Sequence, residues 1–217
     1  MQENKIVVIN LDRAGERKEK ISAQLDAQKL KYYIYSGFDA KNLTNKTVSP
    51  GKLVKGYGSP RDFKKGEMGC TLSHIGVITM AKTLGWENVV ILEDDIVLCK
   101  DFEKRLKLLF KYLPKTWEHV FLGGHLYNHI PLLKPSCVPS PKISGTYSYM
   151  LNHTVYDKAI KELSSMETTT DDLYEHMKLK SYIFFPLFSY PLLEYSYVNE
   201  EKENRIHSSK PHFAEYL

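Results

Sequence analysis

Lys5–Asn10 (KIVVIN) begins the stretch that decides the fold of this chain. The run is short, rich in β-branched residues and apolar on both faces, which predicts a buried strand. A charged amphipathic segment follows at 14–29, with Ile21 and Leu25 on its apolar side, and predicts a helix. The aromatic segment KYYIYS at 31–36 predicts the next strand. Strand, helix and strand at this spacing form a βαβ unit, so we expect an α/β fold with parallel strand pairing.

The same patterns predict the remaining elements of the chain. Apolar residues at helical spacing predict helices at 66–85, 101–113, 154–164 and 171–179. Short apolar or aromatic runs predict strands at 88–92, 119–122, 146–151 and 182–185. Turn-forming residues predict loops at 41–62 and 130–142, and an irregular aromatic tail at 186–217. No repeat or linker divides the sequence, so we expect a single domain over residues 1–217.

Composition and charge exclude several classes of protein. Of the 217 residues, 42% are apolar and 26% are charged, which is typical of a globular domain and not of a disordered or fibrous chain. The formal net charge of +4 is lower than nucleic-acid binders usually carry, so we expect no nucleic-acid partner. The three cysteines have no CxxC spacing and imply neither a disulfide framework nor a zinc cage.

The sequence has no pattern typical of a targeting or membrane-spanning segment. Its start, MQENK, leads directly into the first strand without the regions of a signal peptide. No apolar run reaches the roughly 20 residues that span a bilayer. We therefore expect a cytoplasmic location. Basic residues at 104–111 would favour peripheral contact with the inner membrane face, although a solvated helix face explains them as well.

An acidic triplet, Glu93-Asp94-Asp95, directly follows the predicted strand at 88–92. Ligands of open α/β sheets bind at the carboxyl ends of strands. Adjacent carboxylates repel one another unless a cation lies nearby, and their oxygen atoms suit hard cations such as Mg²⁺ or Mn²⁺. An exposed acidic turn without a ligand is the alternative. A phospho-receiver site is disfavoured, because it needs an aspartate after a later strand and the strand at 119–122 ends in two glycines.

Residues upstream of the triplet offer a place for a diphosphate. The first strand ends in Asn10-Leu11-Asp12-Arg13, and Arg17 lies one turn after Arg13 on the same face of the following helix. Helix N-termini attract phosphate groups, so both arginines are candidates for binding one. A simply exposed Arg17 is the alternative.

The predicted helix at 66–85 carries a second group of candidates. Gly69 permits the close approach of another backbone segment. Ser73 and His74 would point along the helix toward the strand end that carries the carboxylates. A single histidine is more often structural than a ligand, so both interpretations of His74 stay open.

Three segments follow one another in a specific order: IVVINLDR (6–13), GEMGCTLSH (66–74) and VVILEDD (89–95). FLG (121–123), GTYSY (145–149) and DDL (171–173) accompany them. Over roughly residues 5–180 this order resembles glycosyltransferase family 25. That family holds the lipopolysaccharide and lipooligosaccharide glycosyltransferases of bacteria and the collagen galactosyltransferase domains. The pairing of Gly-Cys-x-x-Ser-His with Leu-Glu-Asp-Asp is more specific than a single glycine motif.

The resemblance implies a GT-A-like fold, in which a mixed, mostly parallel central sheet is flanked by helices. Residues 1–124 would form the nucleotide-sugar-binding half, and residues 125–217 the acceptor half and C-terminal tail. The resemblance also implies transfer of a hexose, galactose or glucose, from a UDP-sugar with inversion at the anomeric carbon. The acceptor would be a hydroxyl group of a glycan, a lipid-linked glycan or a protein.

Family positions carried over to this sequence imply roles for single residues. Glu93, Asp94 and Asp95 would hold Mn²⁺ (or Mg²⁺) and meet the donor, with Asp95 and Glu93 as metal ligands and Glu93 and Asp94 at the donor. The nucleotide would be bordered by Asn10, Leu11 and Arg13, with Arg17 one turn beyond, and the donor pocket lined by Ser73 and His74. His207 would complete the metal shell from the tail, as a late histidine does in many GT-A enzymes, and a structural histidine is the alternative.

Inverting transfer needs a base near the acceptor hydroxyl, on the face opposite the departing phosphate. Asp171 and Asp172 lie downstream, in the expected acceptor half, and are the candidates for this catalytic role. An N-terminal helix cap is the alternative, because an aspartate after Thr170 suits capping. The alternative function is a family member that binds nucleotide sugar but has lost transfer.

Overall fold

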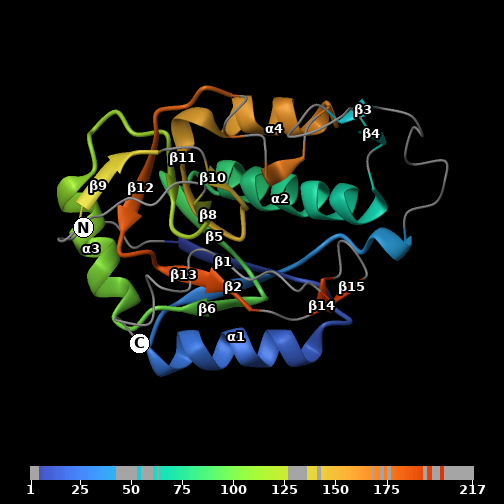
Figure 1. Cartoon of the computed structure of the whole chain (residues 1–217), viewed down its shortest axis with the longest axis horizontal. Helices are drawn as coiled ribbons and strands as arrows, with labels where there is room; N and C mark the ends of the chain where they lie inside the picture. Colours follow the sequence, from blue (N-terminus) through green and yellow to red (C-terminus); the bar gives the residue numbers. More distant parts are fainter. Residues whose placement is uncertain are drawn as a thin grey trace.

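The computed structural model describes residues 5–42, 53–54, 61–62, 64–126, 136–140, 143–167, 169–171, 174, 177–192, 195–196 and 201–202. A seven-stranded sheet lies at its centre, in the order β2-β1-β5-β11-β7-β12-β9 (Figure 1). Its strands are β1 (Lys5–Asn10), β2 (Tyr32–Ser36), β5 (Asn88–Glu93), β7 (His119–Phe121), β9 (Ser136–Pro139), β11 (Ser148–Asn152) and β12 (Ser181–Phe185). Five of the seven run in one direction, opposed by β11 and β9. The predicted α/β class with a mixed, mostly parallel sheet is confirmed.

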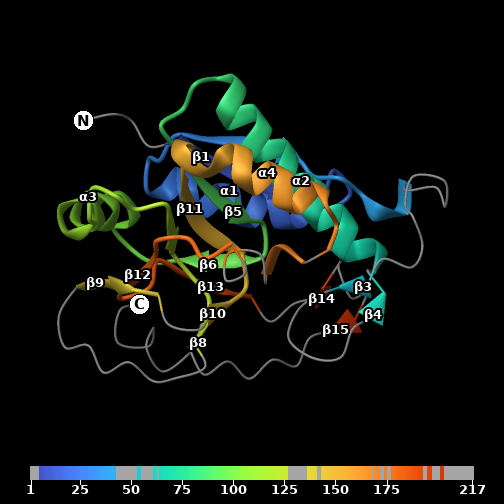
Figure 2. The ribbon, with the colours of Figure 1, turned by 90° about the horizontal axis from the view of Figure 1, so that it is seen from above.

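Helices flank this sheet, as predicted. They are α1 (Gly15–Ala27), α2 (Lys65–Thr83), α3 (Phe102–Tyr112) and α4 (Tyr156–Ser164), with short helical turns η1 (Ala40–Asn42) and η2 (His153–Val155). Helices α2 and α4 lie side by side on one side of the sheet, and α1 lies on the other (Figures 1 and 2). Among the described residues, no helix has both the length and the apolar composition that crossing a membrane requires.

The predicted βαβ unit brings the end of the first strand to the acidic triplet. Strand β1 pairs in parallel with β2 on one side and with β5 on the other. Val7 and Val8 are completely buried, which explains why the strand is apolar on both faces. In the β1–β5 register Ile9 lies opposite Glu93. The residues that follow Ile9 and Glu93 are therefore neighbours.

The two halves of the sequence share the central sheet. Strand β11, from the half after residue 124, lies between β5 and β7 of the first half and runs antiparallel to both. The assignment of one half to the nucleotide sugar and the other to the acceptor stays a prediction.

The two loop predictions were wrong in part. Within 130–142, Ser136–Pro139 forms β9, which pairs antiparallel with β12 at the edge of the sheet. An edge strand pairs with one neighbour only, so this four-residue strand shows little alternation of apolar and polar residues. Its last residue is a proline, which edge strands tolerate because its nitrogen has no hydrogen to donate. Within 41–62, the structure has η1 and a short pairing of β3 (Leu53–Val54) with β4 (Arg61–Asp62).

The tail, predicted to be irregular, also contributes paired strands. Its β13 (Ser189–Pro191) pairs with β6 (Ile96–Leu98), and its β14 (Tyr195–Ser196) pairs with β15 (Glu201–Lys202). Outside the tail, β8 (His125–Leu126) pairs with β10 (Ile143–Ser144). Directly after β13, the Leu192 N–H donates to the Asp95 carbonyl at 2.7 Å. The backbone that leaves the acidic triplet is therefore fixed by residues almost a hundred positions away, which no local pattern reveals.

Helix α2 packs closely on the segment that follows β2. A Cβ atom added at Gly69 would lie 2.6 Å from the Phe38 carbonyl oxygen and 3.2 Å from the Ala40 nitrogen. Both obstacles are backbone atoms, so relieving the contact would require η1 to shift. The close approach predicted at Gly69 is confirmed.

We expect Gly69→Ala to lower the free energy of unfolding by about 1–3 kcal/mol, as overpacking typically does, although alanine favours a helix. Gly15→Ala is the matched control, because a Cβ there has no atom within 4 Å and should be neutral or stabilising. Urea unfolding followed by circular dichroism measures both. Equal stability of the two variants would contradict the close contact at Gly69.

Candidate active site at the ends of β1 and β5

The first side chain after Ile9 contacts the middle of the acidic triplet. Asn10 is 3% exposed, and its Nδ2 donates to Asp94 Oδ2 at 2.7 Å and to the Ala14 carbonyl at 3.1 Å. The amide thus links the end of β1, the start of α1 and the end of β5. Asn10 ends β1, and its contacts hold Asp94 in place, whereas its contact with a donor stays a prediction.

Arg17 supplies the cation that the triplet needs. Its Nη1 donates to Asp94 Oδ1 at 3.2 Å and to Asp95 Oδ2 at 3.1 Å, and its side chain is only 9% exposed. The alternative of a simply exposed Arg17 is wrong, because the carboxylates draw the guanidinium inward from the first turns of α1. Both oxygens of Asp94 are therefore engaged by protein groups.

The three carboxylates have different surroundings. The side chain of Asp94 is 9% exposed, whereas those of Glu93 and Asp95 are each 27% exposed. Asp94 and Asp95 follow the last residue of β5, and the same Arg17 nitrogen contacts both, so Asp94 differs from its neighbours through its additional buried contact with Asn10. Burial raises the pKa of Asp94, although Arg17 and the Asn10 hydrogen bond act to lower it. The alternative of an exposed acidic turn is wrong for Asp94.

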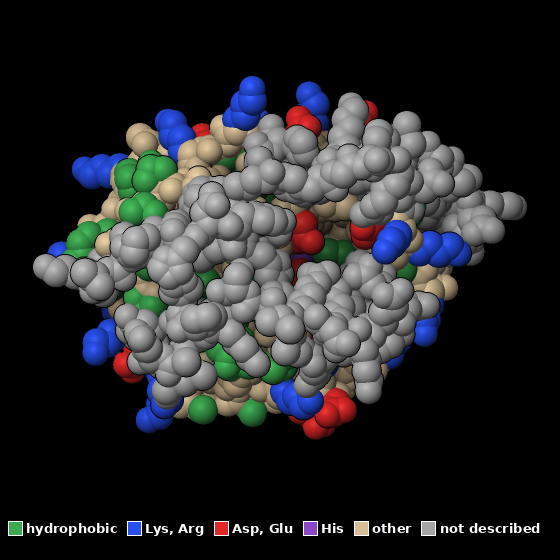
Figure 3. Space-filling view, in the orientation of Figure 1, with side chains coloured by type: hydrophobic (Ala, Val, Ile, Leu, Met, Phe, Trp, Pro, Cys, Tyr) green, Lys and Arg blue, Asp and Glu red, His purple; other side chains and the backbone are tan. Residues whose placement is uncertain are grey.

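Asp171 lies close enough to Glu93 to act on its charge. Burial raises the pKa of Glu93 well above its usual value, and the nearby charges of Asp95, Asp171 and Asp94 raise it further. Glu93 and Asp95 of the triplet and Asp171 from a distant part of the sequence thus share one region, which we call the acidic cluster. Acidic side chains and a histidine are visible near the middle of the face in Figure 3.

The Asp171 carboxylate is also hydrogen-bonded to Thr146. Its Oδ1 accepts hydrogen bonds from the Thr146 N–H at 2.9 Å and from Thr146 Oγ1 at 2.8 Å. Thr170, Asp171 and Tyr174 have helical backbone, in agreement with a short helix in this region. Asp172 and His207, the other predicted base and the third predicted metal ligand, lie outside the described residues.

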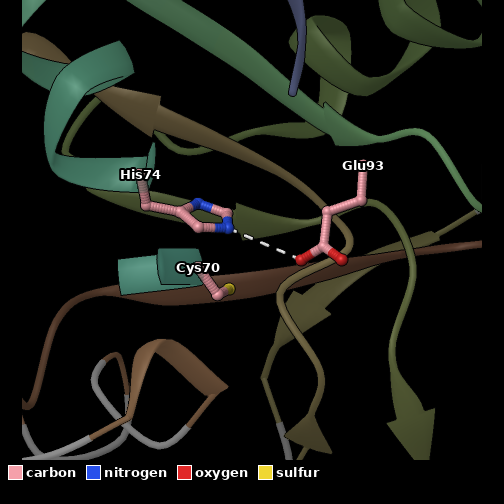
Figure 4. Close-up of side chains that lie close together, drawn as sticks. All are labelled: Cys70, His74 and Glu93. Atoms are coloured by element: carbon pink, nitrogen blue, oxygen red, sulfur yellow. Dashed lines mark ion pairs between the residues drawn. The ribbon is translucent and has the colours of Figure 1, made fainter. Parts of the chain in front are cut away.

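The buried imidazole of His74 faces the Glu93 carboxylate (Figure 4). It is 1% exposed, its Nδ1 is 2.9 Å from the Tyr149 hydroxyl oxygen, and its Nε2 is 3.5 Å from Glu93 Oε1. Burial lowers the pKa of His74 to about 3, so the imidazole is neutral near pH 7. Cys70, one turn earlier on α2, points at the same place.

Sequence reasoning missed Cys70 and Tyr149. The i, i+4 spacing of Cys70 and His74 on a predicted helix was the available signal for the cysteine. Tyr149 had no such signal, because nothing local pairs it with a residue 75 positions earlier.

The remaining predicted donor residues surround the first βα turn. Arg13 is paired with Asp39, and the Leu11 carbonyl accepts a 2.7 Å hydrogen bond from the Ala14 N–H. The buried Ser73 hydroxyl accepts from the Phe38 N–H and donates to the Gly69 carbonyl, both at 2.7 Å. Ser73 thereby holds the segment after β2, and direct contact of these residues with a donor stays a prediction.

We expect Arg17→Met to lower the free energy of unfolding at neutral pH by about 3–5 kcal/mol, because it leaves buried carboxylates without their cation. Lys20→Met on the same helix is the control: its ion pair with Glu16 joins side chains that are 42% and 82% exposed, and should contribute less than about 0.5 kcal/mol. Urea unfolding at several pH values measures both.

The pH dependence of the Arg17→Met deficit has a defined sign. When the pKa of a carboxyl is higher in the folded protein than in the unfolded chain, the folded state binds more protons. The protein therefore becomes less stable as pH rises. Removing Arg17 raises the folded pKa of Asp94 further. The deficit should therefore shrink as pH is lowered from about 7 toward about 4, and a constant deficit would argue against the pairing.

Comparison with known proteins identifies the family of this sequence. The family model described as "Glycosyltransferase family 25 (LPS biosynthesis protein)" matches residues 3–174. Procollagen galactosyltransferase 2 of Mus musculus is 23% identical over 220 residues, which cover 96% of this chain and 34% of that protein. A probable inactive glycosyltransferase 25 family member 3 of Rattus norvegicus is 27% identical over 154 residues, covering 67% of this chain and 27% of that protein.

A solved structure was also found. It is a crystal structure of a glycosyltransferase involved in the glycosylation of the major capsid of PBCV-1, with 8% identity and a TM-score of 0.42 over 82% of this chain and 72% of its own. The present chain spans about a third of the length of the mouse relative and less of the rat one. The family match extends over most of the sequence and includes β1, α2, the acidic triplet and Asp171. The chain belongs to glycosyltransferase family 25.

Proposed function

We propose that this chain is a metal-dependent, inverting hexosyltransferase that uses a UDP-sugar. It would move a hexose, galactose or glucose, to a hydroxyl group of a glycan or protein. Family membership supports a glycosyltransferase, and one relative is named a procollagen galactosyltransferase. The observation that carries the proposal is the acidic cluster, whose Glu93 and Asp95 lie at the carboxyl end of the central strand β5, where ligands of α/β sheets bind.

The residues of the acidic cluster fit a divalent cation. On their exposed side, Glu93 and Asp95 offer only oxygen atoms as metal ligands. Hard cations such as Mn²⁺ or Mg²⁺ prefer such ligands. The neighbouring carboxylates that raise the pKa of Glu93 repel one another, and a cation would offset this repulsion. Glu93 and Asp95 would hold the ion, which when bound would stabilise the charge on the departing diphosphate. A contribution from His207 stays a prediction.

The first βα turn would border the donor nucleotide. Asn10, Leu11 and Arg13 lie where β1 passes into α1, next to the cluster. Arg17 and Asn10 act on the donor site mainly by holding Asp94 and Asp95 in position, because their polar atoms already contact these carboxylates. His74 is neutral and would present an uncharged group behind Glu93.

Asp171 is our candidate for the general base. An inverting displacement needs a base that removes the proton from the acceptor hydroxyl, on the face opposite the leaving group. Thr146 orients one carboxylate oxygen of Asp171, and Asp171 is exposed. These contacts support the interpretation of Asp171 as a positioned base. The competing interpretation is that Asp171 caps a helix.

Location and acceptor belong to the same proposal. We expect a cytoplasmic enzyme with peripheral contact at the inner membrane face, where a lipid-linked acceptor would lie. The exposed lysines Lys104, Lys107 and Lys111 on α3 would favour contact with anionic headgroups. A protein hydroxyl is the other acceptor class, suggested by the procollagen relative.

We expect Asp95→Asn to reduce Mn²⁺-dependent hexose transfer by about 100-fold or more, because the variant removes a charged ligand while keeping the shape of the side chain. A screen of nucleotide sugars by thermal shift, with and without Mn²⁺, identifies the donor first. Asp157→Asn is the control, since that carboxylate is 80% exposed on α4. Undiminished transfer by Asp95→Asn would contradict the metal assignment.

Asp171→Asn separates a base from a structural residue. The amide oxygen can still accept both Thr146 hydrogen bonds, so the variant removes the charge and basicity of the carboxylate and keeps these contacts. We expect turnover to fall by about 100- to 10,000-fold while UDP binding, measured by calorimetry, and the unfolding midpoint stay unchanged. A loss of stability with full turnover of the folded fraction would favour the cap.

The second candidate is a protein that binds nucleotide sugar without transferring it. The observation that favours it is that several similar relatives are named as inactive or probably inactive family members. Hydrolysis of radiolabelled UDP-hexose in the presence of Mn²⁺ separates the two candidates. Turnover without an acceptor supports the enzyme, whereas binding without any turnover supports the second candidate.

A further inference from the structure

A second group of possible metal ligands lies on the inner side of Glu93. Cys70 and His74 occupy one face of α2 at i, i+4 spacing, and Glu93 ends β5. One ligand atom of each, sulfur, imidazole nitrogen and carboxylate oxygen, lies within 4.8 Å of the other two. Figure 4 shows the three side chains converging from α2 and from the strand end. Four-coordinate zinc would bring such atoms to roughly 3.3–3.8 Å from one another, so small side-chain rotations would suffice.

The imidazole supplies an independent sign of a ligand. His74 is 1% exposed, and within the described part of the chain its Nε2 makes no hydrogen bond. This atom faces Glu93 Oε1 at 3.5 Å. A buried polar atom without a hydrogen bond costs free energy, and a bound ligand would recover it.

Two hydrogen bonds surround this group in the manner of a metal site. The other ring nitrogen of His74 is 2.9 Å from the Tyr149 hydroxyl oxygen, and metal-bound histidines usually have such a partner, which orients the ring. The Thr170 side chain is a hydrogen-bond partner of the Cys70 thiol and acts to lower its pKa, which burial raises. Both ligands of α2 are thus oriented by residues from β11 and from the segment before Asp171.

We propose that Cys70, His74 and Glu93 bind a borderline-soft divalent cation, of which Zn²⁺ is the best match. Sulfur, imidazole nitrogen and one carboxylate form a three-ligand set that leaves one position for water, as in open zinc sites. This donor set differs from the oxygen-only set of the acidic cluster, which hard cations prefer. The two sites share Glu93 but differ in Cys70 and His74, so zinc binding does not depend on the proposed transfer.

Cobalt spectroscopy of the whole chain tests this site. Co²⁺ replaces Zn²⁺ with the same ligands and, when bound to a thiolate, gives a charge-transfer absorption in the near ultraviolet. We expect this absorption to appear when metal-free protein is titrated with Co²⁺ and to disappear on addition of Zn²⁺. Absence of the absorption at saturating Co²⁺ would overturn the proposal.

Variants assign the absorption to the cluster. Cys70→Ser should abolish it, and Tyr149→Phe should weaken Zn²⁺ binding by about 10- to 100-fold through loss of the histidine's partner. Cys137→Ser, at a similarly half-buried cysteine, is the matched control and should keep the absorption. Asp95→Asn should also keep it, which separates this site from the proposed hard-cation site.

One more variant guards against misfolding of Cys70→Ser. The chain has three cysteines, so the double variant Cys99→Ser/Cys137→Ser leaves Cys70 alone, and any thiolate absorption must then come from it. Retention of the absorption in this background supports the site. An absorption that survives in folded Cys70→Ser, or vanishes in the double variant, would overturn it.

Discussion

The buried contact among Asn10, Arg17 and Asp94 determines how the whole site is arranged. Asn10 ends β1, Arg17 lies in α1, and Asp94 follows β5, so one carboxylate connects three elements. A buried charge is tolerated only when it is paired and hydrogen-bonded, and here each oxygen of Asp94 has its own donor. The first βα turn and the end of β5 therefore keep one relative position. The positions of the partly exposed carboxylates Glu93 and Asp95, on either side of Asp94, depend on this contact.

The triplet combines one structural and two outward-facing carboxylates. Asp94 is enclosed, whereas Glu93 and Asp95 keep part of their surface in solvent near Asp171. Like charges gathered at one place destabilise the folded chain, and sites that hold such charges commonly bind a cation or a substrate. The proposed hexose transfer uses the exposed side of this arrangement. Stability is provided by the enclosed side, through Arg17.

Glu93 lies between two chemically different environments. Toward Asp95 and Asp171 the neighbouring atoms are carboxylate oxygens, whereas toward α2 they are a sulfur and an imidazole nitrogen. The difference arises because the buried face of α2 is partly polar near its start, where Thr71, Ser73 and His74 are enclosed. Burying polar side chains costs free energy that apolar residues would not cost. The polar residues on this face of α2 therefore point to a role other than packing.

Local sequence patterns determined the elements and the position of the site along the chain. KIVVIN predicted a strand buried on both faces, the βαβ spacing predicted parallel pairing, and the triplet after 88–92 predicted a site at the carboxyl end of a strand. Only the tertiary structure decided that Arg17 is buried, that Asp94 differs from its neighbours and that Cys70 meets Glu93. Arg17 and Asp94 are 77 residues apart, and their contact depends on the register of β1 against β5. Periodicity reports which face of one element is apolar, but it carries no information on which distant side chain will occupy the opposite face.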